Sequence, residues 1–426
     1  MKRMRAVWGA GVLALAAAAL AGVIATVSLG GWQSLPETAP LTVEVYDPRY
    51  VEAGQEAARL LEAMRAANGI PGATAAVSVD GVLVWAAGTG WADLESLAPV
   101  TPATLFRIGS TSKAVTATVV ARLQDEGLLD VGDTVADHIA APLNPLWGPM
   151  QIDQLLAHTA GFPGYDNNTD WLGFIESLRM SRQFASVEEG LRLVDSSRLL
   201  GAPGERFYYS SFDTSLAALV AERASAADFA SLIQSRVRAP LGLDTPVLAD
   251  HGPPPEGLAR FYSLGGGGRV RERGAVNVSQ RWAGGGLYGR SADLVRLGGA
   301  WLDDDFVSQQ TRARFWEPMQ LNSGDVNEQS YALGWRVQPE SVVTFGPGAP
   351  VRVVHHGGVS RGAMSWLIIY PELGIAAAVN INAETPGFAD FSRVEPAIVR
   401  LFAGAAGRTP QGAARPYDDP PRDSAG

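Results

Sequence analysis

The sequence contains no cysteine and almost no lysine, and these two shortages narrow its chemistry. Without cysteine among the 426 residues, thiol catalysis, disulfide bonds, cysteine-ligated zinc and lipid attachment through a cysteine are all excluded. Lysine occurs only at Lys2 and Lys113, so thirty-two of the thirty-four basic residues (34 − 2) are arginine. Because arginine keeps its proton in proteins whereas lysine can lose it, Lys113 is the one deprotonatable lysine outside the N-terminal segment.

Net positive charge is also absent. The formal net charge is −10 and no block of basic residues offsets it, which argues against nucleic-acid binding. Only five histidines are present, without an H-E-x-x-H motif, so a metallohydrolase is disfavoured, and we expect no metal and no cofactor. With 46% hydrophobic and 18% charged residues, the chain is long enough to bury one large core or two.

One long hydrophobic run opens the chain. Lys2, Arg3 and Arg5 precede an uncharged apolar segment at 6–29. This segment is longer than the roughly 7–15 residues of a secretory h-region and fits a bilayer span of about 20 residues. We therefore expect residues 1–29 to be an uncleaved membrane anchor, positive inside, with the rest of the chain extracytoplasmic, in the periplasm.

Cleavage after Ala19-Leu20-Ala21, an A-x-A pattern, is the alternative for this segment and would release a secreted or periplasmic protein. Residues 30–50 carry two prolines and are interpreted as a tether. The tail at 405–426 is rich in Gly, Pro, Ala and Arg, a composition typical of disorder.

The stretch from Ser110 to Lys113 matches the S-x-x-K motif. Apolar residues recur at every fourth position after it, which predicts a helix with Ser110 in its first turn and Gly127 just beyond its end. Lys113 then lies one turn after Ser110 on the same face, and the N–H groups of the helix start can stabilise an oxyanion. The pattern predicts a nucleophilic serine activated by a lysine that burial or a neighbouring cation keeps neutral.

Periodicity predicts the elements around this motif. Two apolar runs flank Asp80-Gly81, which is a strong hairpin signal. Residues 128–289 are predicted to be mostly helix and loop, with the glycine run at 265–268 a flexible turn. We expect strands at 73–79, 82–87, 332–337, 351–355, 365–370 and 374–380, and helices at 51–67, 216–224, 291–302 and 391–402.

Two further motifs supply what a Ser-Lys site needs. Tyr209 stands in a turn ahead of the helix at 216–224, where its hydroxyl can shuttle a proton between Ser110, Lys113 and a leaving group. His356-Gly357-Gly358 is predicted to end one strand and lead to another. Its glycines would let a backbone N–H approach an acyl oxygen closely.

Two other residues invite a catalytic role that the sequence does not favour. His158 precedes a Thr and a glycine turn, so we interpret it as a structural hydrogen bonder. Ser360 lies in a G-x-S-x-G pattern, which in α/β-hydrolases is followed by a helix and, further on, a histidine. Here residues 363–370 are predicted to be a strand and no histidine follows His356, so Ser360 is interpreted as a turn residue.

With these motifs in order, the chain resembles the serine β-lactamase-like and penicillin-binding-protein superfamily, which includes class C β-lactamases, D-Ala-D-Ala carboxypeptidases and family VIII esterases. The resemblance covers about residues 57–403, and the motif sequences are most similar to those of the mitochondrial serine β-lactamase-like branch. The motifs that carry it are FRIGSTSK, LLAHTAGFPGY, PGERFYYSS, RWAGGGLYGRSADL, YALGW and HHGGVSRGAMSWL.

The resemblance implies an α+β fold of the β-lactamase/transpeptidase type, with an antiparallel sheet flanked by helices and a mostly helical second domain. The hydrolase domain would span 51–404. Its α/β part would comprise about 51–107 and 287–404, its helical part about 108–286, and the site would lie in the cleft between them. The reaction implied is acyl transfer on a small-molecule or peptide substrate, without a cofactor. The oligomeric state does not follow.

The resemblance also implies roles for individual residues. Ser110 would be the nucleophile, Lys113 its base and Tyr209 the tyrosine of Y-x-N. The backbone N–H groups of Ser110 and Val359 would form the oxyanion hole. The substrate-binding positions implied are Ser211, His356, Gly357 and Gly358.

Two departures from the family pattern bear on the substrate. Ser211 stands in place of the Asn of Y-x-N, and His356 stands in place of the Lys of K-T-G. Both favour the hydrolysis of a peptide, amide or ester over efficient β-lactam turnover. The alternative to an enzyme is a catalytically weak, membrane-tethered binding or scaffold protein with the same fold. Ser211, in place of the family's Asn, keeps this alternative open.

Overall fold

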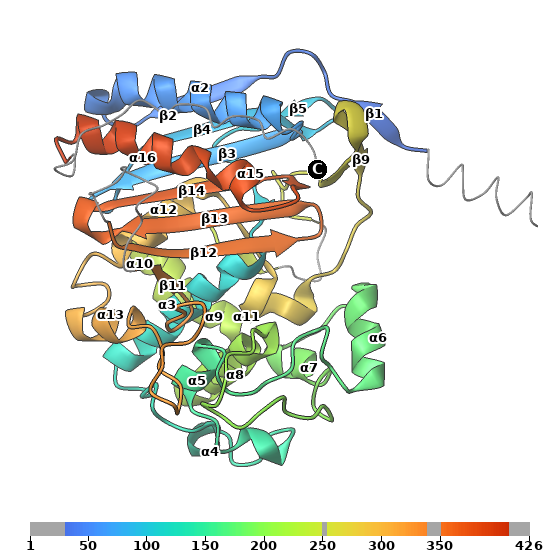
Figure 1. Ribbon diagram of the computed structural model, residues 1–426, viewed down its shortest axis with the longest axis vertical. Helices are drawn as coiled ribbons and strands as arrows, with labels where there is room; N and C mark the ends of the chain where they lie inside the picture. The colour runs from blue at the N-terminus through green and yellow to red at the C-terminus, as the bar shows by residue number, and fades with distance from the viewer. Residues whose placement is uncertain (1–29, 249–253, 339–350, 409–426) are drawn as a thin grey trace, which may run out of the picture.

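An antiparallel sheet forms the centre of the computed structural model, which describes residues 30–248, 254–338 and 351–408 (Figure 1). The strands lie in the order β11, β12, β13, β14, β3, β4 and β2, and β5 pairs with β4. Strands from both ends of the chain meet where β14 pairs with β3. The bounds are β2 Leu41–Val45, β3 Gly72–Val79, β4 Val82–Asp93, β5 Ala98–Pro99, β11 Arg336–Gln338, β12 Val353–Ser360, β13 Ala363–Tyr370 and β14 Ile375–Ile381.

Helices cover both faces of this sheet. The helices α2 (Val51–Ala67) and α16 (Val394–Ala405) lie side by side on one face, and α12 (Ser291–Ala300) packs on the other (Figure 1). Successive strand residues point to opposite faces, so Ala75 and Val77 join the α2 and α16 core, whereas Ala76 joins the core under α12. The predicted α+β class, an antiparallel sheet flanked by helices, is confirmed.

Two smaller sheets accompany the central sheet among the described residues. A four-stranded sheet has the order β1, β9, β8 and β15, and a three-stranded sheet has the order β6, β10 and β7. Residues 41–45, assigned from sequence to a tether, form the edge strand β2, and β8 and β9 fall inside the range predicted to be mostly helical. The bounds are β1 Trp32–Ser34, β6 Phe106–Arg107, β7 Val247–Leu248, β8 Tyr262–Leu264, β9 Arg269–Glu272, β10 Leu287–Gly289 and β15 Ala383–Glu384.

Most of the remaining helices pack around α3 (Ser112–Asp125) and α8 (Ser211–Ser225). Both helices are apolar or small on nearly every side, a composition typical of fully buried helices. The other bounds are α4 Val135–His138, α5 Ile152–Leu156, α6 Trp171–Arg179, α7 Val187–Leu191, α9 Phe229–Ile233, α10 Ala239–Leu241, α11 Trp282–Gly285, α13 Gln309–Phe315 and α15 Ala389–Ser392.

Local sequence signals are confirmed where the turn chemistry is strong. The helix predicted at 51–67 coincides with α2, and Asp80 and Gly81, with φ of +50° and +77°, form the predicted hairpin turn. The strand predicted at 332–337 is largely wrong, because β11 begins only at Arg336. Gly334, with φ of +79°, bends the chain against α3, where an added Cβ would lie 2.5 Å from Cβ of Ala117.

The predicted anchor at 1–29 and most of the predicted tail, at 409–426, lie outside the described residues. Within residues 30–248, 254–338 and 351–408, none of the helices combines the length and the hydropathy needed to cross a bilayer.

A buried carboxyl on α16 predicts a pH-dependent stability. Glu395 is 2% exposed and accepts a hydrogen bond from the Tyr370 hydroxyl (2.9 Å), and burial raises the pKa of Glu395 to about 8. The folded protein therefore holds a proton that the unfolded chain loses above its own pKa of about 4.3, so stability falls as pH rises from about 5 to 8.

Glu395→Gln is expected to remove this dependence. Relative to wild type, the variant should gain stability with rising pH, on the order of 5 kcal/mol in total by pH 9. Urea unfolding of both proteins at pH 5, 7 and 9 measures the difference. A difference that stays constant across this range would contradict the assignment of a protonated Glu395.

Candidate active site

Ser110 lies in a short 3₁₀ turn, Gly109–Thr111, that leads into α3. The Ser112 hydroxyl donates to the Gly109 carbonyl (2.7 Å) and holds the turn against the helix. Lys113 is the second residue of α3, and its Nζ lies 3.2 Å from Ser110 Oγ. Ser110 was predicted in the first turn of the α-helix and instead immediately precedes it. The structure nonetheless brings the serine and the lysine together.

The Lys113 amine is fully buried and has three close partners. Nζ lies 2.6 Å from the Gly284 carbonyl and 3.0 Å from Ser211 Oγ, in addition to Ser110 Oγ. A neutral amine has two N–H donors and one lone pair, so two donors can satisfy Gly284 and Ser211. The lone pair is then left to face the Ser110 hydroxyl, which is the arrangement that a base needs.

Electrostatics favour this neutral form. Burial, and next the positive charge of Arg336, hold the pKa of Lys113 well below its usual value, against a smaller opposite effect of Asp213. Arg336 lies on the edge strand β11, with its Cζ 5.7 Å from the centre of the Tyr209 ring. The direction of this shift favours the neutral amine that proton abstraction requires, and its two largest causes are those expected from the sequence, burial and a neighbouring cation.

Tyr209 lies in the segment that precedes α8, and its ring packs on Lys113, with Nζ 4.7 Å from the ring centre. Its hydroxyl lies near enough to Ser110 for the two groups to interact electrostatically. The residue is 36% exposed, so part of its side chain faces solvent. Burial raises the pKa of Tyr209 to about 12, and the phenol therefore keeps its proton at neutral pH.

Strand β12 approaches the Ser110 turn as closely as glycine allows. A Cβ added at Gly358 would lie 1.9 Å from the Ile108 carbonyl oxygen and 2.9 Å from the Ser110 nitrogen. A Cβ added at Gly109 would likewise lie 2.7 Å from the Val359 nitrogen, and Val359 is 45% exposed. The backbone N–H groups predicted to form an oxyanion hole, those of Ser110 and Val359, therefore belong to neighbouring backbones beside an exposed surface.

The His356-Gly357-Gly358 motif occupies the middle of β12, not its end as predicted, because the turn to β13 is made later, at Gly362 with φ of +76°. The His356 side chain is fully buried, and its Nε2 lies 2.7 Å from the Tyr331 hydroxyl. In this arrangement His356 contacts protein groups, and an effect of its ring on a substrate would be transmitted through Tyr331.

The other sequence candidates have clear positions. Ser211, predicted to bind substrate, is buried at the start of α8, where its hydroxyl contacts Lys113 and interacts electrostatically with Tyr165. Ser360 closes β12 opposite Ala363, and a strand follows it, so the helix that a nucleophile elbow needs is missing at this position. Ser360 was predicted to be a turn residue and is instead the last residue of β12, directly before the turn at 361–362.

Sequence reasoning missed four residues at this site: Tyr331, Arg336, Asp213 and Gly284. The first belongs to the YALGW motif, but neither its pattern nor its spacing indicates that the phenol reaches His356. Arg336 follows the motif directly. It lowers the pKa of Lys113, which is far away in the sequence, and this effect becomes visible only in three dimensions. Gly284 contributes a backbone carbonyl, for which side-chain motifs carry no signal.

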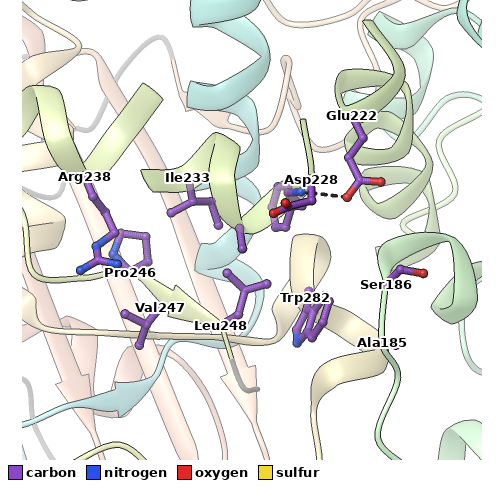
Figure 2. Close-up of a pocket in the computed structure, with 12 residues that line it drawn as sticks. Ala185, Ser186, Glu222, Asp228, Ile233, Arg238, Pro246, Val247, Leu248 and Trp282 are labelled. Carbon is purple, nitrogen blue, oxygen red and sulfur yellow. Dashed lines mark hydrogen bonds between the residues drawn. The ribbon is translucent and has the colours of Figure 1, made fainter. Parts of the chain in front are cut away.

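A cavity of about 370 Å³ lies beside α11 (Figure 2). Trp282 lines this cavity, whereas Gly284, two residues later, accepts a hydrogen bond from Lys113. Arg238 lies at one end of the view and Glu222 at the other, with apolar side chains between them. No residue of the predicted Ser-Lys-Tyr site lines it, so this cavity is separate from the candidate active site.

Known proteins are similar to this chain over most of its length. A protein-family model described as Beta-lactamase matches residues 57–397. The chain is 26% identical over 422 residues to the serine beta-lactamase-like protein LACTB, mitochondrial, of Homo sapiens, covering 81% of this chain and 76% of that protein. It is also 26% identical over 298 residues to penicillin-binding protein 4* of Bacillus subtilis (strain 168), covering 66% of this chain and 61% of that protein.

Solved structures share the fold. The D-amino acid amidase from Ochrobactrum anthropi SV3, complexed with D-phenylalanine, superposes with a TM-score of 0.68 at 20% sequence identity. The superposition covers 84% of this chain and 100% of that one. At this identity the likeness establishes the shared architecture, in which the two ends of the chain build one sheet.

Proposed function

The chain belongs to the beta-lactamase family and is a serine hydrolase, and on this basis we propose that Ser110, Lys113 and Tyr209 cleave a peptide, amide or ester through an acyl-enzyme. The observation that carries the proposal is the buried Lys113 amine, 3.2 Å from Ser110 Oγ with its other two contacts on acceptor groups. A neutral amine in this position has its lone pair directed at the hydroxyl that must lose a proton.

Acylation begins with attack of Ser110 Oγ on the substrate carbonyl carbon, while the hydroxyl proton passes to Lys113. The carbonyl oxygen becomes an oxyanion, which the backbone N–H groups of Ser110 and Val359 stabilise. The close approach of β12 to the Ser110 turn supports this assignment, since it brings the backbones of the two residues next to each other. Collapse of the intermediate breaks the bond to the leaving group.

Tyr209 completes the proton transfer. Its ring contacts Lys113 and its hydroxyl interacts with Ser110, so it can deliver a proton to the leaving nitrogen or oxygen and regain one from the Lys113 ammonium. A phenol that stays protonated at neutral pH suits this role. In deacylation a water molecule attacks the ester at Ser110, and the same groups take and return its proton.

The substrate proposal follows from Ser211 and His356. The Ser211 hydroxyl contacts Lys113 and interacts with Tyr165, and the His356 ring is hydrogen-bonded to the Tyr331 hydroxyl. Neither residue offers the free amide or ammonium group that the family pattern places there, and this favours peptides, amides or esters over β-lactams. We also propose export with a membrane anchor, supported by the basic and apolar sequence of residues 1–29.

Intact-mass spectrometry of the full-length protein tests this function. A β-lactam, a D-Ala-D-Ala peptide, an L-peptide and a short-chain ester are offered separately, and peptide mapping locates each adduct. We expect an acyl adduct on the peptide that carries Ser110, longest-lived with the β-lactam and turning over with a peptide or ester. Absence of any adduct, with the fold intact, would favour a catalytically weak binding protein.

A further inference from the structure

The buried His356 ring, in the middle of β12, makes a second contact besides the one with Tyr331. Its Nδ1 lies 2.7 Å from the carbonyl oxygen of the next residue, Gly357. A carbonyl oxygen can only accept a hydrogen bond, so Nδ1 carries a hydrogen and donates it. Each ring nitrogen of His356 therefore has a partner, the Gly357 carbonyl on Nδ1 and the Tyr331 hydroxyl on Nε2 at 2.7 Å.

These two hydrogen bonds do not depend on the charge of the His356 ring. In a neutral ring Nε2 accepts from the Tyr331 hydroxyl, and in an imidazolium Nε2 would donate to it. The neutral form is favoured, because the Tyr331 hydroxyl has no other acceptor among the described residues. Burial, and next the positive charge of Arg336, also hold the pKa of His356 well below its usual value. The hydrogen bonds thus run from Tyr331 through His356 to Gly357.

The Gly357 carbonyl lies where β12 has lost one of its two neighbouring strands. Strand β13 pairs with β12 over residues 354–360, whereas β11 reaches only residues 353–355. Beyond His355, one edge of β12 has no strand partner among the described residues. The N–H and C=O of a strand residue point to the same edge, and residues two apart repeat this direction. The Gly357 carbonyl therefore shares an edge with the Val359 N–H proposed for the oxyanion hole.

The same part of β12 lies against the turn that carries Ser110. The Thr111 hydroxyl donates to the His356 carbonyl (3.3 Å), so the residue after Ser110 is bonded directly to β12. A Cβ added at Gly358 would lie 2.9 Å from the Ser110 nitrogen. With the two backbones this close, a rotation of the peptide that follows Gly357 would change the position of the next donor along the strand.

Tyr331 has a fixed position from which to hold the His356 ring. The buried Asn327 side chain accepts from the Tyr331 N–H (2.9 Å) and donates to the Tyr331 carbonyl (2.7 Å). The Tyr331 ring also packs on the His158 ring, at 4.7 Å between centres. As expected from the sequence, His158 is a buried hydrogen bonder, with Nδ1 2.9 Å from Oδ2 of Asp213. The anchor of the His356 ring is therefore itself held by backbone and ring contacts.

We propose that Tyr331 and His356 are positioning residues: the Tyr331 hydroxyl fixes the His356 ring, whose Nδ1 holds the Gly357 carbonyl and so keeps the Val359 N–H directed at the oxyanion. This inference rests on the proposed acyl-enzyme function. Both side chains are 0% exposed, so they act through the backbone of β12 and not by touching substrate. The histidine of this motif thus supports the oxyanion hole in place of binding substrate.

Two substitutions at His356 separate its two hydrogen bonds. His356→Asn keeps an N–H at the position of Nδ1, so the Gly357 carbonyl stays bonded and kcat should fall no more than about threefold. His356→Gln keeps a partner for Tyr331 but loses the donor to Gly357, and kcat should fall about 30-fold. KM should change less than about twofold in this variant, because oxyanion stabilisation acts mainly in the transition state.

Tyr331→Phe removes one oxygen atom and keeps the aromatic packing. The His356 ring then loses its anchor and can turn away from Gly357, so we expect kcat to fall about tenfold, again with little change in KM. Steady-state kinetics of the three variants and wild type, with the preferred substrate, measure these effects.

Hydrogen–deuterium exchange of the substrate-free proteins provides a readout that needs no turnover. Peptides that cover residues 353–362 should exchange at least about threefold faster in His356→Gln and Tyr331→Phe than in wild type, whereas His356→Asn should resemble wild type. A purely structural role would give a different pattern, because each of the three variants loses one buried hydrogen bond and all would be loosened alike.

Equal losses of kcat in His356→Gln and His356→Asn would overturn the proposal, and so would unchanged exchange of β12 in His356→Gln. If His356→Gln does not fold, Tyr331→Phe decides, and wild-type kcat and wild-type exchange in that variant would overturn the proposal. If no substrate acylates the wild type, the proposed function fails, while the exchange rates still decide whether the Tyr331 and His356 side chains hold β12.

Discussion

Ser110→Ala is expected to form no acyl-enzyme and to hydrolyse the preferred substrate at least about 10⁴-fold more slowly than wild type. The variant removes Oγ, the atom that would bond to the substrate carbonyl, and leaves Lys113 and Tyr209 with no hydroxyl to deprotonate. The turn around it is held by other groups, among them the Ser112 hydroxyl on the Gly109 carbonyl, so the fold should persist. Labelling by a fluorophosphonate probe and steady-state kinetics measure the loss.

Ser360→Ala is the matched control. This serine lies in the G-x-S-x-G pattern at the end of β12, and the variant should label and turn over like wild type, because a strand follows it and the proposed chemistry does not use it. Probe labelling that survives in Ser110→Ala and disappears in Ser360→Ala would reverse the assignment of the nucleophile. Circular dichroism of both variants confirms that differences in labelling reflect chemistry.

Lys113→Met is expected to lower kcat/KM by about 10³-fold, because methionine fills a similar buried volume but offers no lone pair to accept the Ser110 proton. Wild type should gain activity as pH rises through the Lys113 pKa, since the active base is the unprotonated amine and its pKa is held well below the usual value of lysine. This rising limb should be missing from the residual activity of Lys113→Met. The pH dependence of kcat/KM for both proteins measures it.

Lys113→Arg provides the complementary variant. Arginine keeps a cation next to Gly284 and Ser211 but does not lose its proton, so it should be as inactive as Lys113→Met. Activity retained in Lys113→Arg would mean that the site needs the charge of this residue and not its lone pair. Thermal melting of both variants shows whether the buried position tolerates each side chain.

The proposed catalytic pair was predictable because it is local. Ser110 and Lys113 are three residues apart, and helical geometry alone brings residues at this spacing together, which the distance of 3.2 Å bears out. The scarcity of lysine distinguishes Lys113 by composition alone. The hairpin at Asp80-Gly81 and the helix at 51–67 were predictable for the same reason, since turn chemistry and periodicity act within a few residues.

Predictions failed where one segment meets another that is distant in sequence. Gly334 bends against α3 and shortens β11, and the glycines of β12 lie within a strand because the chain turns only at Gly362. Residues 41–45 looked like a tether and form an edge strand, because their partner residues in β4, Trp85 to Thr89, are forty or more positions away in the sequence. No local pattern contains this information.

By itself the sequence determined the family, the nucleophile motif and the exclusion of thiol chemistry, because these depend on residue identity and short spacing. Only the tertiary structure decided the electrostatics of the site. Folding buries Lys113 within the electrostatic influence of Arg336 and brings the His356 ring into a hydrogen bond with Tyr331. It also places the paired side chains of His158 and Asp213 behind Tyr209. The reason is physical: whether an amine or a carboxyl is charged depends on the solvent it loses and on charges brought close by folding, not on its neighbours along the chain.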